Sequence, residues 1–483
     1  MRFLNRETIK HIGEKVKVCG WVNSRRLHGK ILFIDLRDRS GILQLVFTPS
    51  QPTVYQTALE LRSEWVIEVE GQILKRPAQM VNPKLETGEV EMIVDKLTVL
   101  SKSLNPPFSI EGDGYEIREE LRMKYRYLDL RRERMKQNLI MRHKVVKFMR
   151  DYLDKEGFIE IETPLLTKST PEGSRDFIVP SRLHPGKFYA LPQSPQQYKQ
   201  ILQVAGIEKY MQVARCLRDE DLRGNRQFEH TQMDLEMSFV QEEDVMSLIE
   251  NLLINLVKNL YPHKKIQEIP FPRLRWQEAM KRYNSDKPDL RRDKNDPNLL
   301  AFCWVTDFPF FEKDEEGKWT FTHNPFSAPK VEYKKDLLEK KNIEKIIAAQ
   351  YDIVLNGAEI GGGSIRGNTP EILESVFEII GYRKEEIKEQ FGHMLAAFQY
   401  GAPPHGGIAL GIDRILSILQ NEEDIREVIA FPKSGDGRDL MMNAPSEVSS
   451  QQLKEVHIRI LKEKESKAPK PKKRKPKKLS KKK

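Results

Sequence analysis

The stretch ARCLRDEDLRGNRQFEHTQMDLEMSF, residues 214–239, decides how the rest of this chain is interpreted. Its charges follow no single helical face, whereas residues 232–239 alternate between apolar and polar, which predicts two strands joined by a charged loop. Guanidinium groups such as those of Arg218 and Arg226 bind phosphates through paired hydrogen bonds, and a carboxylate such as Glu220 binds an amine. The loop therefore suits a ligand with phosphates and a planar base, although a solvated charged hairpin would explain the same residues.

Length and composition describe a globular protein with more than one domain. The chain has 483 residues, of which 39% are hydrophobic and 31% charged, so it can bury a sizeable core. Cys19, Cys216 and Cys303 are too far apart in the sequence for a metal-ligand cluster or a disulfide framework, so we expect a reducing, cytoplasmic setting. The sequence has neither a long apolar run nor a secretory leader, which predicts a protein without a membrane span.

Much of the net charge of +10 lies at the C-terminus. Residues 466–483 are rich in lysine and proline and almost free of apolar side chains, which predicts a disordered tail. Such a tail would attract nucleic acid in a salt-dependent way, but a tail that only keeps the protein soluble would have the same composition.

Residues 1–104 contain five short alternating runs separated by turns, which predicts a small barrel, with the oligonucleotide-binding (OB) type as the leading candidate. In LFIDLR at 32–37 the even-numbered residues are apolar, so Phe33 should point outward, and the same count turns Gln44 outward. An exposed aromatic ring near an amide and the Arg25-Arg26 pair is typical of contact with an unpaired base. A Phe covered by a neighbouring loop is the alternative.

A second domain follows a probable hinge at 105–118, which contains two prolines and the sequence GDG. Helical spacing of apolar residues predicts a long helix over 119–155 with one break. After it, residues 157–164 alternate as a strand does and end in Pro164, so this strand could form an edge that pairs with a second subunit.

The sequence DIVLNGAEIG, which begins at Asp352, predicts a metal site. Its Asn-Gly pair is typical of a two-residue hairpin turn, which would pair Val354 with Glu359 and Asp352 with Gly361. Asp352 and Glu359 then become diagonal neighbours on one face, where two carboxylates can hold Mg²⁺ that carries ATP phosphates. The glycines at 361–363 would let a ligand approach, whereas two unrelated surface acids are the alternative.

Several motifs together resemble the bacterial-type aspartyl-tRNA synthetases, a family of class II aminoacyl-tRNA synthetases. They are RYLDLRR at 126–132, the strand that ends in Pro164, TPEGSRDF at 170–177, LPQSPQQYKQ at 191–200, RDEDLR at 218–223, GAEIGGGSIR at 357–366 and GIALGIDR at 407–414. Their number and order make the resemblance specific. It implies an α+β homodimer with an anticodon-binding OB-type barrel at 1–104 and a class II catalytic domain at 119–465, in which helices flank an antiparallel sheet.

The resemblance also implies a reaction and its residues. ATP and L-aspartate would form aspartyl-adenylate with Mg²⁺ as cofactor, and the aspartyl group would pass to tRNA(Asp). Arg218, Glu220 and Arg414 form the expected catalytic set, which acts by electrostatic stabilisation. Besides these three, the implied ATP-binding residues are Asp219, Gln227, His230, Glu359, Gly411, Ile412 and Asp413. Besides Arg218, the implied aspartate-binding residues are Glu172, Gln196, Lys199, Asp234, His323 and Arg366.

Charge in the implied pocket favours aspartate as the substrate. Arg366 and Lys199 match the family's cations for the side-chain carboxylate, and Glu172, Gln196 and Asp234 match the groups around the ammonium. With asparagine as substrate, we expect the two buried cations to be left without an anion. An asparagine-specific sister enzyme, a tRNA-independent asparagine synthetase and a non-catalytic tRNA-binding paralogue are the alternatives.

Three departures from the family pattern stand out. The segment 285–312, SDKPDLRRDKNDPNLLAFCWVTDFPFFE, runs straight across the point where bacterial members carry an extra domain. His230 stands where the family has a Phe that stacks on adenine, and a histidine could titrate near neutral pH. His323-Asn324 replaces a pair of histidines near the substrate, and His323 alone could still close over aspartate.

The barrel also carries residues that match the family's anticodon readers. Phe33 and Gln44 match the readers of the central base, with Arg26 and Glu91 beside them. His28 resembles the form found in non-discriminating members, which charge both tRNA(Asp) and tRNA(Asn). We therefore expect relaxed specificity at the third anticodon position, unless His28 is a turn residue without a base contact.

Overall fold

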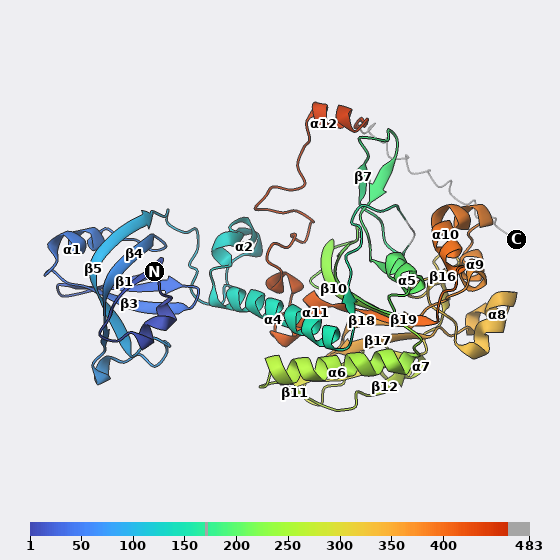
Figure 1. Ribbon diagram of the computed structural model, residues 1–483, viewed down its shortest axis with the longest axis horizontal. Coiled ribbons are helices and arrows are strands. Elements are labelled where there is room, and N and C mark those ends of the chain that lie inside the picture. The colour runs from blue at the N-terminus through green and yellow to red at the C-terminus, as the bar shows by residue number, and fades with distance from the viewer. Residues whose placement is uncertain (170–171, 462–483) are drawn as a thin grey trace, which may run out of the picture. The chain divides into compact units, whose positions relative to one another are not determined.

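The computed structural model describes residues 1–169 and 172–461 (Figure 1). The tail expected at 466–483 and the first two residues of the 170–177 motif lie outside the described residues. The chain divides into two compact units, Met1–Ile117 and Arg118–Lys483, and this division falls within the segment 105–118. No helix among the described residues is long and apolar enough to cross a membrane.

The first unit is a closed five-stranded barrel, as the sequence predicts. Its strands follow the order β1-β2-β3-β5-β4 around the barrel. They are β1 (Lys15–His28), β2 (Ile31–Asp38), β3 (Gly41–Phe47), β4 (Val66–Lys75) and β5 (Val90–Ser101), accompanied by the helix α1 (Pro52–Leu59) and by 3-10 helices at Asn5–Lys10 and Ala78–Met80. Leu32, Ile34 and Leu36 of β2 are fully buried, so the residues between them face outward.

The second unit is built on an eight-stranded sheet in the order β12-β14-β17-β18-β19-β10-β9-β6. In that order the strands are β12 (Arg273–Arg275), β14 (Phe302–Thr306), β17 (Gln350–Leu355), β18 (Ala358–Ile365), β19 (His405–Gly411), β10 (Glu229–Ser238), β9 (Lys209–Leu217) and β6 (Ile159–Glu160). The six central strands are antiparallel, and both edge strands pair in parallel. The expected antiparallel sheet is therefore mixed at its edges.

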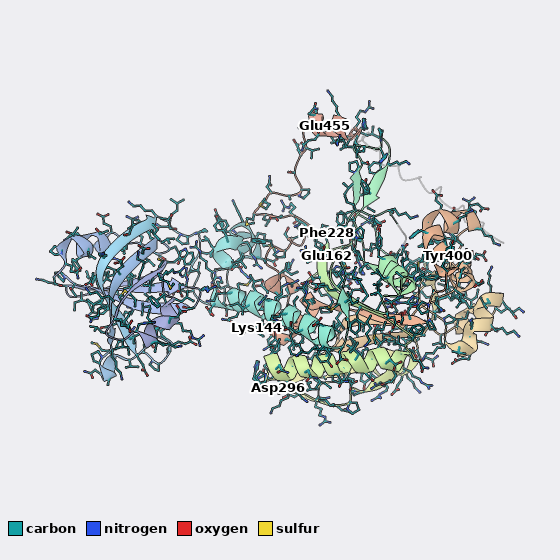
Figure 2. All side chains as sticks on the ribbon, viewed as in Figure 1. Lys144, Glu162, Phe228, Asp296, Tyr400 and Glu455 are labelled. Atoms are coloured by element: carbon teal, nitrogen blue, oxygen red, sulfur yellow. The ribbon has the colours of Figure 1, made fainter. Side chains whose placement is uncertain are left out.

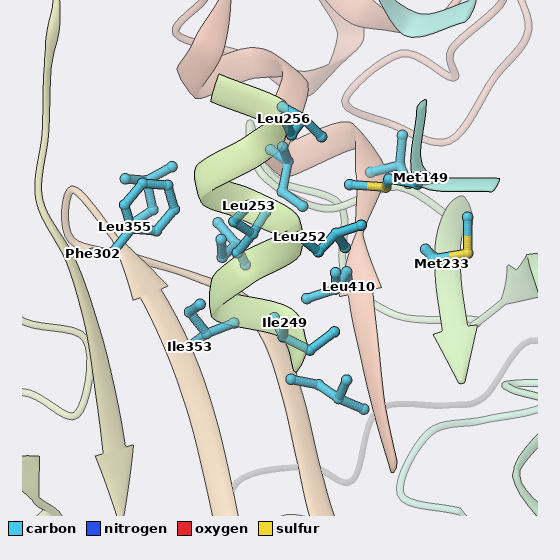
Figure 3. Packing of buried hydrophobic residues seen from close by; sticks show 14 of the residues in the cluster. Met149, Met233, Ile249, Leu252, Leu253, Leu256, Phe302, Ile353, Leu355 and Leu410 are labelled. Carbon is cyan, nitrogen blue, oxygen red and sulfur yellow. The ribbon is translucent and has the colours of Figure 1, made fainter. Parts of the chain in front are cut away.

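Helices cover one face of this sheet and form the main core. The helices α4 (Glu133–Lys155), α6 (Glu242–Leu260) and α11 (Ile412–Leu419) contribute apolar side chains to it. Ile249 and Leu253 of α6 lie over Ile353 and Leu410 of the sheet (Figure 3). Burying each such side chain contributes about 1.5–3 kcal/mol, so this contact holds the central strands in place.

The remaining elements complete the second unit around this sheet. They are α5 (Gln196–Val204), α7 (Trp276–Tyr283), α8 (Lys334–Glu339), α9 (Pro370–Ile379), α10 (Lys384–Phe398), α12 (Ser450–Glu455), 3-10 helices at Val331–Tyr333, Ile343–Lys345 and Ile425–Val428, and the strand pairs β7 (Ile178–Pro180) with β8 (Phe188–Ala190), β11 (Lys265–Ile266) with β13 (Leu299–Leu300), and β15 (Phe311–Lys313) with β16 (Trp319–Phe321).

The helix expected over 119–155 is broken twice instead of once. It consists of α2 (Glu119–Lys124), α3 (Arg126–Asp129) and α4, because Tyr125 and Arg132 leave the helical conformation with ψ of 42° and 141°. Next to these breaks the fully buried Asp129 pairs with Arg122, Arg126 and Arg132 at 2.8–3.1 Å.

The strand expected from 157 to Pro164 is also shorter than the sequence predicts. Only Ile159 and Glu160 form β6. Ile161 still donates one backbone hydrogen bond to Met211 of β9, but Thr163 bonds that strand through its hydroxyl group. The alternating pattern therefore continues beyond the point where the backbone leaves the sheet.

Candidate active site

The period of two along the strands separates the core from a cavity. Met233 and Leu235 of β10 point into the core beneath the helices, so Asp234 and Glu236 point to the opposite face. A cavity of about 740 Å³ opens on that face. Its wall includes these expected site residues: Glu172, Gln196, Lys199, Arg218, Asp219, Glu220, Gln227, His230, Asp234, His323, Glu359, Arg366, Gly411, Asp413 and Arg414.

The charged segment at 218–228 joins β9 to β10, so the predicted strand, loop and strand are confirmed. The loop is closed against residues 172–177. Asp219 donates its backbone N–H to Arg175 at 3.0 Å, Ser174 donates its hydroxyl to Glu220, and Phe228, labelled in Figure 2, packs edge-on against Phe177 with ring centroids 5.4 Å apart. The loop is therefore a wall of the cavity rather than a free surface hairpin.

One end of the cavity contains a compact group of buried charges. The Lys199 ammonium lies 2.7 Å from an Asp234 oxygen and 3.1 Å from a Glu236 oxygen. Arg366 donates through Nε to Glu236 at 2.9 Å and through Nη1 to Ser364 Oγ at 2.8 Å. All four charged side chains are almost fully buried. The two cations thus meet two carboxylates within the protein.

This pairing corrects the charge argument made from the sequence. Lys199 and Arg366 already have anions, so a substrate without a negative side chain would not leave them unpaired. Glu236, which the sequence reasoning missed, is the reason. The strand pattern could have identified Glu236, because Glu236 lies two residues after Asp234 and the period of two places both side chains on the cavity face.

Burial and ion pairing shift the pKa values of these two carboxylates in opposite directions. Burial would raise the pKa of Glu236, but Arg366 and Lys199 outweigh it and hold that pKa below its ordinary value. Burial raises the pKa of Asp234, although Lys199 acts against it. Glu236 is therefore the firmly ionised member that holds both cations in position.

Glu172 and Gln196 lie at the same end of the cavity. Glu172 accepts hydrogen bonds from Ser194 Oγ at 3.0 Å and from Gln197 Nε2 at 3.1 Å, which orient its carboxylate. Gln196, the first residue of α5, donates its side-chain amide to Gln200 one turn later at 2.9 Å.

Asp352 and Glu359 do converge, but by a different register from the one expected. A bulge between β17 and β18 pairs Asp352 with Gly362 instead of Gly361, because Ile360 is an extra residue whose side chain enters the core. A Cβ atom on Gly362 would lie 2.9 Å from Asp352 Oδ1 and 3.6 Å from Glu359 Oε1. The two carboxylates therefore meet over Gly362. Gly361 and Gly363 instead allow close packing against β19.

The surroundings shift the pKa values of Asp352 and Glu359 in opposite directions. Burial raises the pKa of Asp352 to about 7 and Glu359 adds to this effect, whereas His323 and the Gln350 amide oppose it. The pKa of Glu359 is lowered, because Lys287 at 3.0 Å and Arg414 outweigh its burial. His323 Nε2 lies 3.7 Å from Asp352 Oδ2, so His323 stands beside the acidic pair.

Two carboxylates on one buried face suit one Mg²⁺ ion that takes its other ligands from water or phosphate. Residues 1–169 and 172–461 contain no group of three His, Cys, Asp or Glu side chains that could hold a metal ion. Asn324 has a local role instead, because its side chain accepts the backbone N–H of Phe326 at 3.0 Å.

His230 lies opposite Cys216 on the neighbouring strand. Burial, together with Arg218 and Arg414, lowers the pKa of His230 to about 3. The expectation that it titrates near neutral pH is therefore wrong, and the ring is uncharged at pH 7. Gln227 accepts the backbone N–H of Lys433 at 2.8 Å through Oε1, and its buried Nε2 has no hydrogen-bond partner among the described residues.

Arg414 occupies the first turn of α11, as the sequence predicts, and donates to the Glu359 carbonyl. The neighbouring residues Ile412 and Asp413 make contacts that stabilise the fold. Ile412 is fully buried in the core, so its side chain is not available to a nucleotide. Asp413 accepts from Arg142 and, at 2.9 Å, from the backbone N–H of Thr231, which ties α11 to β10.

The expected anticodon residues gather on the outer face of the barrel. Arg26 pairs with Phe33 across β1 and β2, and its guanidinium holds Asp35 through two hydrogen bonds of 2.7 and 2.9 Å. Gln44 on β3 donates to Glu91 on β5 at 2.8 Å. The sequence prediction gave Asp35 no part in this site.

His28 is exposed and lies at the end of β1, paired with Ile31, rather than in the turn itself. It follows Arg26 by two residues. Its side chain therefore shares a face with Arg26 and Phe33.

Comparison with protein families identifies the class. Residues 118–435 match the family model described as tRNA synthetases class II (D, K and N), and residues 16–100 match the OB-fold nucleic acid binding domain. The chain belongs to the class II tRNA synthetase family.

Its curated relatives narrow this class. The aspartate–tRNA(Asp/Asn) ligases of Rubrobacter xylanophilus, Caldanaerobacter subterraneus subsp. tengcongensis and Dictyoglomus turgidum are 41%, 42% and 44% identical. These alignments cover 93%, 94% and 94% of this chain and 95%, 97% and 96% of the relatives. They extend over 574 to 577 positions, so the relatives carry residues without a counterpart in these 483.

Solved structures share the fold. Asparaginyl-tRNA synthetase from Pyrococcus horikoshii, complexed with asparaginyl-adenylate, matches with a TM-score of 0.71 and 21% identity over 88% of this chain and 96% of that one. A putative aspartyl-tRNA synthetase from Leishmania major matches with a TM-score of 0.73 and 18% identity over 89% of this chain and 93% of that one.

Proposed function

We propose that this protein is an aspartate–tRNA ligase that charges tRNA(Asp) and also tRNA(Asn). It forms aspartyl-adenylate and pyrophosphate from L-aspartate and ATP, and then transfers the aspartyl group to the terminal ribose of the tRNA. The observation that carries this proposal is a cavity that joins a buried amino-acid subsite to Glu359 of the acidic pair and to several arginines. The relatives named Asp/Asn ligases support the same reaction.

Adenylate formation needs electrostatic help rather than a nucleophilic side chain. When the aspartate carboxylate attacks the α-phosphorus, negative charge builds up on the phosphate oxygens. Arg218 lines the cavity and can bind both the α-phosphate and the substrate carboxylate. Arg414 binds the outer phosphates, and Glu220, oriented by Ser174, accepts a hydrogen bond from the nucleotide. The uncharged His230 ring offers a face on which adenine stacks.

Asp352 and Glu359 would hold a Mg²⁺ ion, which supplies positive charge against the ATP phosphates when it is bound. Residues of the chain itself prepare this site. Gln350 donates to Asp352 at 2.9 Å and so orients the carboxylate toward Gly362. Lacking a Cβ atom, Gly362 leaves space for a ligand beside the pair.

Aspartate is selected by fixed donors rather than by excess positive charge. Lys199 and Arg366 are held by Glu236, so their remaining N–H groups point in set directions. A carboxylate accepts from both cations, whereas an amide presents N–H groups that would face donors. Glu172 and Asp234 receive the substrate ammonium.

The barrel and a second subunit complete the proposal. Phe33, Arg26, Gln44 and Glu91 contact the anticodon, and His28 tolerates both third bases. We infer a homodimer, because Ile159 at the edge strand and the nearby Leu165 and Leu166 are each more than half exposed. The three cysteines are free thiols, which is compatible with a cytoplasmic location.

The test combines two assays on the full chain. ATP–pyrophosphate exchange is measured with aspartate and, in parallel, with asparagine, because the paired cations do not exclude asparagine by charge alone. Transcripts of tRNA(Asp) and tRNA(Asn) are then charged with labelled aspartate. We expect exchange with aspartate only and charging of both tRNAs. Exchange with asparagine alone would make the protein a sister enzyme, no exchange would support a tRNA-binding paralogue, and charging of tRNA(Asp) alone would contradict the role of His28.

A further inference from the structure

Lys287 faces the acidic pair although none of the roles above uses it. Its ammonium lies 3.0 Å from Glu359 Oε2, and the residue lines the same cavity as Arg218 and Arg414. The Lys287 side chain is 39% exposed, so it can change partners without leaving the protein surface. It belongs to the segment 285–312.

The fold holds Lys287 beside the hairpin that carries Glu359. Its backbone N–H donates to Ser285 Oγ at 3.0 Å, and Pro288 restricts it to an extended conformation. Asp289 packs on the β17–β18 turn, where a Cβ atom on Gly357 would lie 3.2 Å from the Cβ atom of Asp289. Gln267 holds the next residue by a hydrogen bond of 2.9 Å to the Leu290 carbonyl. The contact between Asp289 and Gly357 therefore fixes the segment that carries Lys287 against the hairpin that carries Glu359.

The Lys287–Glu359 pair cannot persist unchanged when the site is filled. A Mg²⁺ ion on the Glu359 carboxylate repels an ammonium group bound to the same carboxylate, and this repulsion is strong at such distances. The phosphates of ATP arrive with the metal and carry several negative charges. They are the anions that a displaced ammonium group beside Glu359 can reach, and lysine binds phosphate as a point charge.

We propose that Lys287 is a phosphate-binding residue, which exchanges Glu359 for the terminal phosphates of ATP when the site is filled. This inference rests on the proposed function. Arg414 donates to the Glu359 carbonyl, and Lys287 pairs with the Glu359 carboxylate, so the two cations reach the terminal phosphates from separate attachment points. When the bond between the α-phosphorus and the bridging oxygen breaks, its electron pair leaves with pyrophosphate. Lys287 stabilises that leaving group.

The test compares Lys287→Met, Lys287→Arg and the control Lys330→Met. Lys330 bridges two carboxylates, Glu242 at 2.9 Å and Asp307 at 2.6 Å, but it does not line the cavity. The Michaelis constants for ATP, pyrophosphate and aspartate are measured by exchange. Binding of inorganic pyrophosphate in the presence of MgCl₂ is measured separately by titration calorimetry, and thermal melting verifies that each variant is folded.

For Lys287→Met we expect the constants for ATP and pyrophosphate, and the calorimetric dissociation constant, to rise roughly ten- to hundredfold, the cost of one charge-assisted hydrogen bond. The constant for aspartate should not change, Lys287→Arg should recover most of the loss, and Lys330→Met should stay within about twofold of the wild type.

Two results would overturn the role of Lys287. One is a Lys287→Met variant no different from Lys330→Met. The other is tighter binding of ATP or pyrophosphate, which would mean that Lys287 only competes with the metal for Glu359. Wild-type exchange serves as the reference, because its absence would contradict the proposed function and not the role of Lys287 alone.

Discussion

At one end of the cavity, Lys199 and Arg366 are matched by Asp234 and Glu236, whereas at the proposed phosphate end Lys287 and Arg414 contact Glu359, whose pKa is lowered while that of Asp352 is raised to about 7. The first group is buried and complete before any ligand arrives. In the second group Asp352 is buried and Glu359 is partly exposed, and under the proposed function a metal ion and phosphates would balance their charges. Under the proposed function, selectivity is thus built into the folded protein, while charge for catalysis stays available to the substrate.

The largest expected effect comes from breaking the buried group. Glu236→Gln leaves Lys199 and Arg366 short of one negative charge in a buried site, so we expect the free energy of unfolding to fall by about 3–5 kcal/mol. Denaturant melts measure it. Glu229→Gln is the matched control on the same strand, because Glu229 forms an exposed pair with Arg215 at 2.6 Å. That change should cost less than about 1 kcal/mol. Equal losses in the two variants would refute a preformed amino-acid subsite.

Arg218→Ala tests the phosphate end, where we expect loss of rate without loss of stability. The Arg218 side chain makes a long hydrogen bond of 3.5 Å to the Gln193 carbonyl, so its removal should leave the melting temperature almost unchanged. Exchange should slow by at least about 10²–10³-fold, as when a donor to a developing charge is deleted. A stable variant with normal exchange would contradict the central role of Arg218.

Phe33→Ala tests the role of the barrel independently of the residues in the cavity. Loss of one stacked base costs about 1–3 kcal/mol, so the Michaelis constant for tRNA should rise roughly 5- to 150-fold. ATP–pyrophosphate exchange needs no tRNA and provides the internal control, since it should be unaffected. If charging is normal, Phe33 is merely a covered surface residue.

The smallest effect is expected from His230→Phe. The folded-state pKa of His230 is about 3, below the unfolded value of about 6.5, so the unfolded chain binds more protons in this window. The histidine therefore stabilises the fold less and less as pH falls from about 6.5 to 3, and His230→Phe should flatten that part of the stability curve. Between pH 6 and 8 the Michaelis constant for ATP should show the same pH dependence in both proteins. A histidine titration seen only in the wild type would show that His230 is charged in the working range.

Periodicity and motif order predicted most of this architecture. The barrel, the strand–loop–strand around Arg218 and the position of Arg414 all follow from local alternation and turn chemistry. The sequence predictions were wrong where contacts between residues distant in the sequence determine the local structure. The bulge at Ile360 shifted the register of Asp352, and the long helix is broken at Tyr125 and Arg132.

The sequence by itself determined which face each side chain takes, because a strand alternates with a period of two whatever lies beside it. Only the tertiary structure decided which of these faces meet. It brought Glu236 between Lys199 and Arg366, and it placed Lys287 against Glu359. It also made His230 neutral by burying it among arginines. Charge compensation and pKa values depend on distances between segments far apart in the chain, and no local pattern contains those distances.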